Sequence, residues 1–401
     1  MSKSMIFHVD VNSAFLSWES VYRIRELGET TDLRLIPSAV GGDQEKRHGV
    51  ILAKSTPAKQ FQIQTGEPIV NALRKCPNLT IVPVRFEIYR KYSKAFLEIL
   101  RSYTPNVEQF SIDEAYMDMS DYPGILESPV EIATRLKDRI HSELGFTVNV
   151  GISNNKLLAK MAGDFKKPNL VHTLFPEEIS KKMWPLEVRD LLYVGKATEQ
   201  KLKNLGIRTI GEIAHANQEM LVAHFGKQGI MMYEYANGID NSVVSTTRPE
   251  PKGYSNSTTV DHDVTDAKEA KQILLSLCES VGHRLRKDEV LATVVAVSIT
   301  DCTFRNSSHQ MSLLSATNST KELHLHICEL FDALWDKKTP IRLLGVHTSK
   351  LTKEDNHQFN LFELANFEQQ NKLNHALDEI RKKFGDGAVM RASKLKKSNE
   401  P

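Results

Sequence analysis

Three carboxylates stand in two apolar stretches of the chain, where charged side chains are otherwise rare. Asp113 and Glu114 lie side by side within Ser-Ile-Asp-Glu-Ala-Tyr, between residues that favour β-strands, and Asp10 ends an apolar run at 5–11. A buried carboxylate needs a partner, because removing its charge from water is costly. Oxygen ligands of this kind suit hard divalent cations such as Mg²⁺. The pattern therefore predicts that the three acids converge on divalent metal.

These acids can share a site only if the chain bends between two strands. Successive side chains of a strand point to opposite faces, so Asp113 and Glu114 can serve one metal cluster only at a bend such as a hairpin tip. The sequence allows this bend, because a Thr-Pro-Asn break at 104–106 precedes one possible strand at 107–110 and a second at 115–119. A single Asp at a strand end is more often a cap or a turn residue, so the metal interpretation depends on all three acids.

Length and composition favour a protein of several domains in the cytoplasm. The chain has 401 residues and a mass of 45.3 kDa, which exceeds what one core usually holds. Its 40% hydrophobic and 25% charged residues are typical of soluble proteins. We expect neither secretion nor membrane insertion, because no leader pattern and no run of about eighteen apolar residues is found. Four cysteines lack the paired spacing of zinc sites and fit a reducing compartment: Cys76, Cys278, Cys302 and Cys328.

The net charge of +2 does not by itself indicate a nucleic-acid-binding protein. An acidic metal site can offset basic surfaces elsewhere, so the distribution of charge matters more than its sum.

Periodicity along the chain predicts an α+β fold. Strand-like runs at 5–11, 107–119 and 146–152 alternate with helical patterns at 89–103 and 130–144. This alternation predicts a sheet covered by helices on one face.

A second sheet module is expected after a polar linker. Alternating segments at 255–260, 292–299 and 341–351 are separated by helical patterns at 267–286 and 321–335. The whole chain is therefore expected to divide into a palm-like domain at 1–32 and 73–165, an inserted subdomain at 33–72, a helical domain at 166–239, a linker at 240–253, a second α/β domain at 254–351, and a tail at 352–401 with one amphipathic stretch.

Asp10, Phe15 and the run Ser-Ile-Asp-Glu-Ala-Tyr together resemble the Y-family (translesion) DNA polymerases, bacterial and of the DinB or UmuC-like kind. The resemblance extends over about residues 5 to 395. It implies a right-hand polymerase with a ferredoxin-like palm, small fingers and thumb, and a C-terminal α/β little finger. It also implies that Asp10, Asp113, Glu114 and the backbone carbonyl of Val11 hold two Mg²⁺ ions.

The same resemblance assigns the nucleotide contacts. An aromatic residue five positions after the first acid is the family's steric gate against a ribose 2′-hydroxyl, which makes Phe15 the candidate. The fingers motif of the family usually has a Tyr and an Arg three residues apart, and here these positions are Thr56 and Lys59. Both departures predict a weaker grip on phosphate, since an ammonium group lacks the bidentate fork of Arg. Lys167 matches a second phosphate-binding Lys, and Asn12 is assigned no role.

Two basic positions follow the third strand of the palm. The run Gly-Ile-Ser-Asn-Asn-Lys-Leu-Leu-Ala-Lys at 151–160 resembles a family motif, and it places Lys156 and Lys160 four residues apart on one helical face. A solvated helix face and a functional role are both compatible with this spacing.

Contacts with DNA and with partners are expected in the thumb and the tail. Gly195 and Lys196 begin a helix-hairpin-helix pattern, in which the free amides of a helix N-terminus can bind a phosphate. Gln358, Leu361 and Phe362 resemble the peptide with which bacterial polymerases bind the sliding clamp. A UmuD-like accessory subunit is a further possible partner.

We interpret the chain as a template-directed DNA polymerase for low-fidelity translesion synthesis on primer–template DNA with dNTP. Two rivals remain at this point. One is a nucleotidyl cyclase-like palm enzyme, which would need no thumb hairpin or clamp peptide. The other is a non-catalytic DNA-binding repair scaffold, which would need no intact acids.

Overall fold

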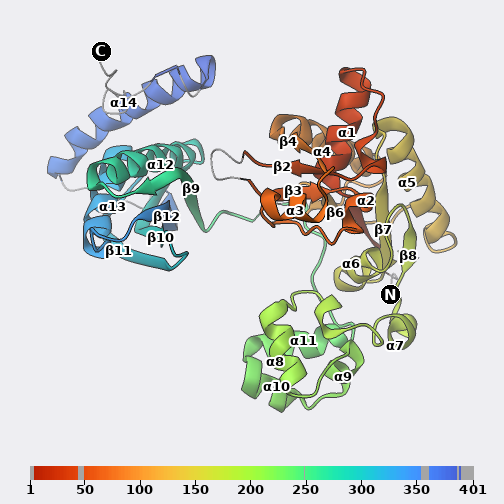
Figure 1. Ribbon diagram of the computed structural model, residues 1–401. Helices are drawn as coiled ribbons and strands as arrows, with labels where there is room; N and C mark the ends of the chain where they lie inside the picture. The colour runs from red at the N-terminus through yellow and green to blue at the C-terminus, as the bar shows by residue number, and fades with distance from the viewer. Residues whose placement is uncertain (1–3, 44–48, 248, 354–360, 386–387, 390–401) are drawn as a thin grey trace. The chain divides into compact units, whose positions relative to one another are not determined.

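A computed structural model describes residues 4–43, 49–247, 249–353, 361–385 and 388–389, with the side chains of 361–371 and 375 left undescribed. The chain falls into two compact units, one of residues 1–42 and 49–248 and the other of residues 43–48 and 249–401 (Figure 1). Each unit has its own hydrophobic core. None of the helices in the described ranges is both long and apolar enough to cross a bilayer.

The first unit is built on a five-stranded sheet with the order β5-β6-β1-β7-β8. Neighbouring strands are antiparallel, except that β7 and β8 are parallel. The three strand-like runs expected here are present, and a bend splits the second of them into two strands. The bounds are β1 Ile6–Val11, β5 Val107–Gln109, β6 Glu114–Asp118, β7 Val148–Ser153 and β8 Val171–Thr173.

One face of this sheet forms the larger core of the unit. Phe7, Val9 and Val11 of β1 are buried there against apolar side chains of three helices. Because side chains alternate along a strand, His8 and Asp10 point to the opposite face. The three helices are α1 Ala14–Glu26, α4 Phe86–Arg101 and α5 Pro129–Leu144.

Helix α6 (Lys156–Asp164) covers part of the opposite face, where no helix was expected. It crosses β7 at Gly151, where a Cβ atom would lie 1.9 Å from the carbonyl oxygen of Ala159 and 2.4 Å from the backbone nitrogen of Gly163. Only a residue without a side chain permits this approach. The expectation that helices cover one face alone is therefore corrected: both faces carry helices, and the acids lie on the face shared with α6.

A three-stranded layer with the order β3-β2-β4 forms the small subdomain. Strand β2 pairs antiparallel with β3 and parallel with β4. Because β4 belongs to this sheet, the layer extends to Pro83 and so passes the end of the expected segment 33–72. Its elements are η1 Leu33–Leu35, β2 Ser38–Gly41, β3 Ile51–Lys54, α2 Thr56–Lys59, α3 Ile69–Lys75 and β4 Thr80–Pro83.

Short helices follow the sheet, as expected for the helical domain at 166–239. Their apolar residues form a separate core that also includes Leu157 and Leu158 of α6. Gly206 follows α8 with φ +83°, a left-handed conformation that suits glycine at a helix end. The elements are η2 Pro176–Glu178, α7 Ile179–Lys182, η3 Val188–Asp190, α8 Lys196–Asn204, α9 Ile210–His215, α10 Gln218–Phe225 and α11 Lys227–Ala236.

The second unit has a four-stranded antiparallel sheet with the order β11-β10-β12-β9. Two helices pack on it, and their apolar residues share one core with the strands. The sequence analysis expected three of these strands and missed β11, which is one of the two edge strands. The elements are β9 Gly253–Val264, α12 Ala267–Lys287, β10 Val290–Asp301, β11 Asn306–Thr317, α13 Thr320–Leu334 and β12 Ile341–Lys353.

Helix α14 (Leu361–Phe384) lies beside α12 within the second unit (Figure 1). Asp378 accepts hydrogen bonds from Nε of Arg286 at 2.7 Å and from its Nη2 at 3.1 Å, and only 4% of the Arg286 side chain is exposed. Arg381 adds a contact of 3.4 Å to Glu279. Ion pairs therefore hold the C-terminal half of α14 on α12.

Candidate active site

Strand pairing brings the first and last of the three acids together. Asp10 of β1 lies directly opposite Glu114 of β6, so both side chains are on one face of the sheet. The chain bends immediately before Glu114, whose carbonyl oxygen accepts hydrogen bonds from the backbone amides of Phe110 and Ser111, each at 3.1 Å. The expected hairpin bend is therefore present at the expected place.

Asp113 lies at this bend, beside the end of β1. Its carbonyl oxygen accepts a hydrogen bond of 3.0 Å from the backbone amide of Val11. Its side chain accepts a hydrogen bond of 2.5 Å from the Ser111 hydroxyl. These bonds place Asp113 next to the Asp10–Glu114 pair. Asp113 precedes Glu114 in the sequence and is bonded to Val11, the residue after Asp10.

Glu114 is flanked by two basic side chains. Nε2 of the buried His8 lies 3.0 Å from Oε2 of Glu114, and the Lys160 ammonium group of α6 contacts the same oxygen. Burial alone would raise the pKa of Glu114, but the hydrogen bonds from His8 and Lys160 outweigh it and hold the pKa at about 2. Glu114 is therefore ionised across the physiological pH range.

Asp10 has the opposite electrostatic balance. Its carboxylate contacts the Lys167 ammonium group, which also lies 2.8 Å from Asp164. Burial raises the pKa of Asp10 more than Lys167 lowers it, and the negative charge of Asp113 raises it further. Asp10 and Asp113 are therefore close enough to repel, which favours the binding of positive charge between them.

The acids are balanced by lysines and not gathered into a ready-made cage. Within the described ranges, no three His, Cys, Asp or Glu side chains form a group that could hold a metal ion. Lys156 and Lys160 are not solvated, since their side chains are 13% and 14% exposed and contact Glu108 and Glu114. Both lysines face the acidic side of the sheet.

Phe15 lies in the first turn of α1 within an aromatic cluster. Its ring stacks on Tyr89 with centroids 5.0 Å apart, and it meets Phe86 edge-on at 5.9 Å. The Tyr89 hydroxyl donates a hydrogen bond of 3.1 Å to the fully buried Glu19. Two aromatic residues of α4 therefore pack against the Phe15 ring, and Phe15 stays partly exposed.

Comparison with known proteins identifies the family. The model of the impB/mucB/samB family matches residues 9–164, that of its C-terminal domain matches residues 251–361, and that of the DNA polymerase-iota thumb domain matches residues 189–240. DNA polymerase IV of Clostridium acetobutylicum is 47% identical over 400 residues, which are 100% of both chains. DNA polymerase IV 1 of Bacillus subtilis is 34% identical over 396 residues, 98% of this chain and 94% of that one. The chain belongs to the Y family of DNA polymerases.

Solved structures agree with this membership at the level of the fold. The "Y-family DNA polymerase chimera Dbh-Dpo4(243-245)-Dbh" matches with a TM-score of 0.74 and 22% identity, over 87% of this chain and 100% of that one. The expected right-hand architecture is thus confirmed. As a Y-family member the chain is a DNA-directed DNA polymerase of translesion synthesis, which acts on DNA and dNTP and uses divalent metal.

The fingers residues of this Y-family polymerase lie in the small three-stranded layer. Thr56 begins α2, which is capped by the Ser55 side chain through a hydrogen bond of 3.1 Å from the Ala58 amide. Thr56 and Lys59 are both exposed. Burial is the main cause that lowers the pKa of Lys54, and the charge of Lys59 contributes to the same shift.

The structure describes the thumb residues predicted to contact DNA but not the side chains of the tail residues predicted to bind the clamp. Gly195 caps the N-terminus of α8, and Lys196 is the first residue of that helix. Gln358 lies outside the described residues. Leu361 and Phe362 begin α14, but their side chains lie outside the described part of the chain. The clamp-binding role of these three residues stays a prediction.

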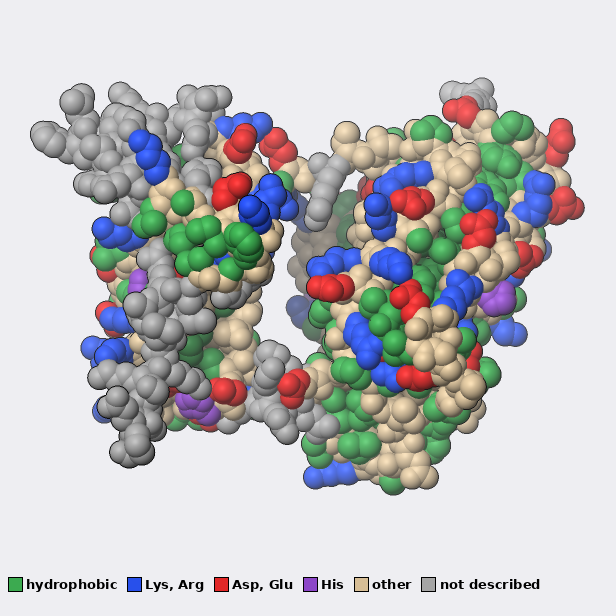
Figure 2. Space-filling view, turned by 90° about the horizontal axis from the view of Figure 1, so that it is seen from above, with side chains coloured by type: hydrophobic (Ala, Val, Ile, Leu, Met, Phe, Trp, Pro, Cys, Tyr) green, Lys and Arg blue, Asp and Glu red, His purple; other side chains and the backbone are tan. Residues whose placement is uncertain are grey.

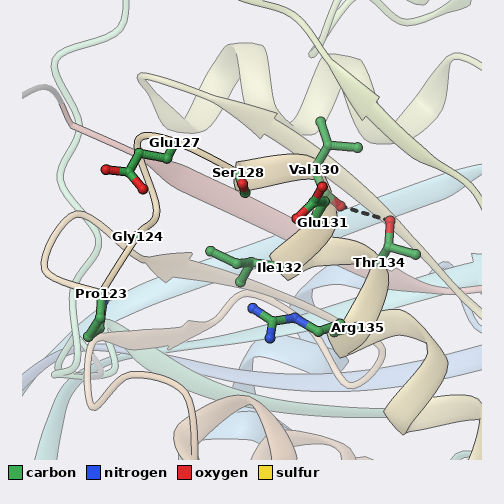
Figure 3. Close-up of a pocket in the computed structure, with 9 residues that line it drawn as sticks. All are labelled: Pro123, Gly124, Glu127, Ser128, Val130, Glu131, Ile132, Thr134 and Arg135. Atoms are coloured by element: carbon green, nitrogen blue, oxygen red, sulfur yellow. Dashed lines mark hydrogen bonds between the residues drawn. The ribbon is translucent and has the colours of Figure 1, made fainter.

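A surface pocket of the polymerase lies away from the acids. Figure 3 shows that it is lined by the loop before α5 and by the first turns of that helix, including Glu127, Glu131 and Arg135. In the first unit, acidic and basic side chains lie next to one another on the surface seen in Figure 2. Neither this pocket nor overall charge would have located the active site.

The sequence analysis missed three residues that surround the acids. His8 contacts Glu114, and the side-chain amides of Asn12 and Asn149 bond to each other at 3.2 Å, with Asn149 paired to Asp10 in the sheet. Asn12 was assigned no role. Alternation along β1 could have revealed His8, because it shares a face with Asp10, whereas nothing in the sequence links Asn12 to Asn149.

Proposed function

We propose that Asp10, Asp113 and Glu114, with the backbone carbonyl of Val11, hold two Mg²⁺ ions for nucleotidyl transfer. The observation that carries this proposal is the pairing of Asp10 with Glu114 across adjacent strands. Asp113 lies beside them, at the bend between β5 and β6, where its carbonyl oxygen bonds to the Val11 amide at the end of β1. All donors are hard oxygens, as Mg²⁺ prefers. Asp10 and Glu114 each already attract an ammonium group, so the site favours positive charge.

The protein side chains have separate tasks in this reaction. Bound divalent ions would lower the pKa of the primer 3′-hydroxyl and neutralise the departing pyrophosphate. Glu114 stays ionised because His8 and Lys160 hold its pKa at about 2. Burial raises the pKa of Asp10, so a cation bound beside it would favour its ionised form.

Four residues are proposed to select and hold the incoming nucleotide. Phe15 excludes a 2′-hydroxyl by occupying its space, and the stacking on Tyr89 keeps the ring in place. Lys167 and Lys59 supply positive charge for the triphosphate, and Thr56 supplies a hydroxyl. The Lys167 ammonium group contacts Asp10, so a phosphate bound there would lie next to the reacting centre.

DNA and partner contacts complete the proposal. Gly195 and Lys196 present the N-terminus of α8 to a DNA phosphate, independently of sequence. Gln358, Leu361 and Phe362 bind the bacterial sliding clamp. The enzyme acts in the cytoplasm. Its fingers run from 33 to Pro83, beyond the expected 33–72, and its palm comprises 1–32 and the residues from 84 to the end of β8 at Thr173, beyond the expected 165. The thumb follows up to 239, the little finger is at 254–351, and a UmuD-like subunit would be an additional partner.

Conservative replacement of the acids tests the metal assignment. Asp10→Asn and Asp113→Asn should lower single-nucleotide incorporation in Mg²⁺ by at least about 10²–10³, because each removes a charge that stabilises the transition state. Affinity for primer–template, measured by fluorescence anisotropy, should change little. Asp118→Asn is the matched control, because Asp118 lies on the same strand as Glu114 but bonds to Ser120.

Near-normal incorporation by Asp113→Asn would contradict the assignment. The same extension assay with the parent enzyme also excludes the cyclase-like and scaffold alternatives, neither of which lengthens a primer on a template.

A further inference from the structure

Two buried amide side chains fasten the loop that carries Lys167. This loop, at 165–170, connects α6 to β8. Nδ2 of Asn149 donates a hydrogen bond of 2.7 Å to the carbonyl oxygen of Lys166, and Oδ1 of Asn12 accepts one of 2.9 Å from the backbone amide of Asn169. The chain is therefore pinned one residue before Lys167 and two residues after it.

The two amides also bond to each other and leave little polar capacity unused. Nδ2 of Asn12 donates to Oδ1 of Asn149 at 3.2 Å, and that oxygen also accepts the Leu170 amide at 3.3 Å. The second hydrogen of the Asn149 amide is directed to the carbonyl oxygen of Gly163 at 3.2 Å. Asn149 is fully buried and Asn12 is 9% exposed. A buried network with every partner in place fixes one arrangement of the chain.

The network joins the acidic strand to the cationic loop. Asn12 follows Asp10 by two residues, and Asn149 is the residue of β7 that pairs with Asp10. On the other side of the network, the Lys167 ammonium group contacts Asp10 and lies 2.8 Å from Asp164. The position of this ammonium group relative to Asp10 is thus set by hydrogen bonds from the end of β1, which carries Asp10, and from β7, which pairs with β1.

We infer that Asn12 and Asn149 are positioning residues for nucleotide addition, which hold Lys167 where the incoming triphosphate must meet its charge. The inference rests on the proposed role of Lys167 in binding that triphosphate. Lys167 binds the triphosphate most tightly when its loop is already ordered, because ordering a loosened loop would offset part of the binding free energy. Loss of the network should therefore weaken nucleotide binding and leave contacts with DNA unchanged.

Steady-state incorporation of a single dNTP by the full-length enzyme tests this inference. Asn12→Ala leaves the partly buried Asn169 amide without its acceptor, and it should raise the KM for dNTP by about tenfold with a smaller change in kcat. The dissociation constant for primer–template should stay within about twofold. Asn12→Ser, whose hydroxyl is too short to reach Asn169, should behave in the same way and replaces the Ala variant if that variant does not fold.

A matched control separates positioning from general stability. Asn237 in the thumb is a partly buried amide that donates hydrogen bonds to the carbonyl oxygens of Tyr233 at 2.9 Å and Ala214 at 3.3 Å. Asn237→Ala should lower the melting temperature to a similar extent and leave the KM for dNTP unchanged. A rise in KM that the control shares in equal measure would overturn the inference.

A double-mutant cycle with Lys167→Ala identifies the residue through which Asn12 acts. In the Lys167→Ala background, Asn12→Ala should raise the KM for dNTP less than about twofold further, because the group that it positions is gone. Equal effects in both backgrounds would overturn the inference while the role of Lys167 stands. If Lys167→Ala alone leaves the KM unchanged, the proposed role of Lys167 fails, and the inference fails with it.

Discussion

Replacing Phe15 with Ala should admit ribonucleotides to the active site at a cost in stability. The ring contacts three aromatic neighbours, Tyr89 at 5.0 Å, Phe86 at 5.9 Å and Trp18 at 6.0 Å between centroids. Each aromatic pair contributes about 0.5–1.5 kcal/mol. Because Phe15 is partly exposed, we expect the substitution to lower the free energy of unfolding by about 2–4 kcal/mol.

The selectivity of the enzyme should change independently of this cost. Exclusion by the ring is a steric clash, so its removal should reduce the preference for dNTP over rNTP in kcat/KM by at least about tenfold, or about 1.4 kcal/mol. Incorporation of one dNTP and of the matching rNTP opposite the same template base measures this ratio. Thermal unfolding measures the stability.

Phe86→Ala is the control for this experiment. Phe86 is 52% exposed and meets the Phe15 ring only edge-on, so its loss should lower stability less and leave the sugar preference intact. If Phe15→Ala lowers stability as expected but keeps the parent ratio of dNTP to rNTP incorporation, Phe15 is a packing residue and the steric-gate assignment is refuted.

Three further predictions concern α14, the tail and DNA. Burial raises the pKa of Asp378, but the hydrogen bonds from Arg286 outweigh it, so the pKa is lowered; the resulting stabilisation is present above the ordinary value of 3.8 and is lost as the pH falls through the folded value. Asp378→Asn should therefore lower the melting temperature of the second unit at pH 7, and the difference from the parent should shrink as the pH falls below 3.8. Burial of the Leu361 and Phe362 side chains in a pocket of the sliding clamp would contribute about 3–6 kcal/mol to binding before ordering costs. Leu361→Ala combined with Phe362→Ala should therefore abolish stimulation by the clamp and leave distributive primer extension unchanged. A double variant that binds the clamp like the parent would disprove the motif. We also expect the thumb and the little finger each to bind several DNA phosphates, so the affinity for primer–template should fall steeply with salt in anisotropy titrations, and a slope near one charge would contradict this expectation.

The hairpin of acids could be predicted from the sequence because its signals are local. A turn-forming break precedes the strands, and β5 Val107–Gln109 and β6 Glu114–Asp118 lie within one or two residues of the expected 107–110 and 115–119. Two adjacent acids can face one site only at a bend, so the chemistry itself required the turn. No knowledge of distant contacts was needed.

Most contacts around the acids could not be predicted, because they join distant parts of the chain. Lys160 meets Glu114 across 46 positions, and Asn12 meets Asn149 across 137. The helical spacing of Lys156 and Lys160 indicated a shared face but not what that face contacts. Only the packing of α6 onto the sheet decides that it turns toward the acids.

Strand β11 was missed for a different physical reason. Its first five residues, Asn306 to Gln310, are exposed and polar, so they lack the alternation that marks a half-buried strand. Its backbone pairs with β10 all the same. Hydrogen bonding along a sheet edge leaves no hydrophobic pattern in the sequence, and tertiary pairing overrides weak local preference.

The missing side chain of Gly151 affects how the active site tolerates change. Because α6 rests on β7 through main-chain atoms, the spacing between the cations of that helix and the carboxylates of the strands is defined by backbone thickness. Substitutions among the core side chains would thus alter the melting temperature but leave the distances between these lysines and carboxylates nearly constant. A methyl group at Gly151 would instead act as a wedge, and it would shift every cation of α6 at once.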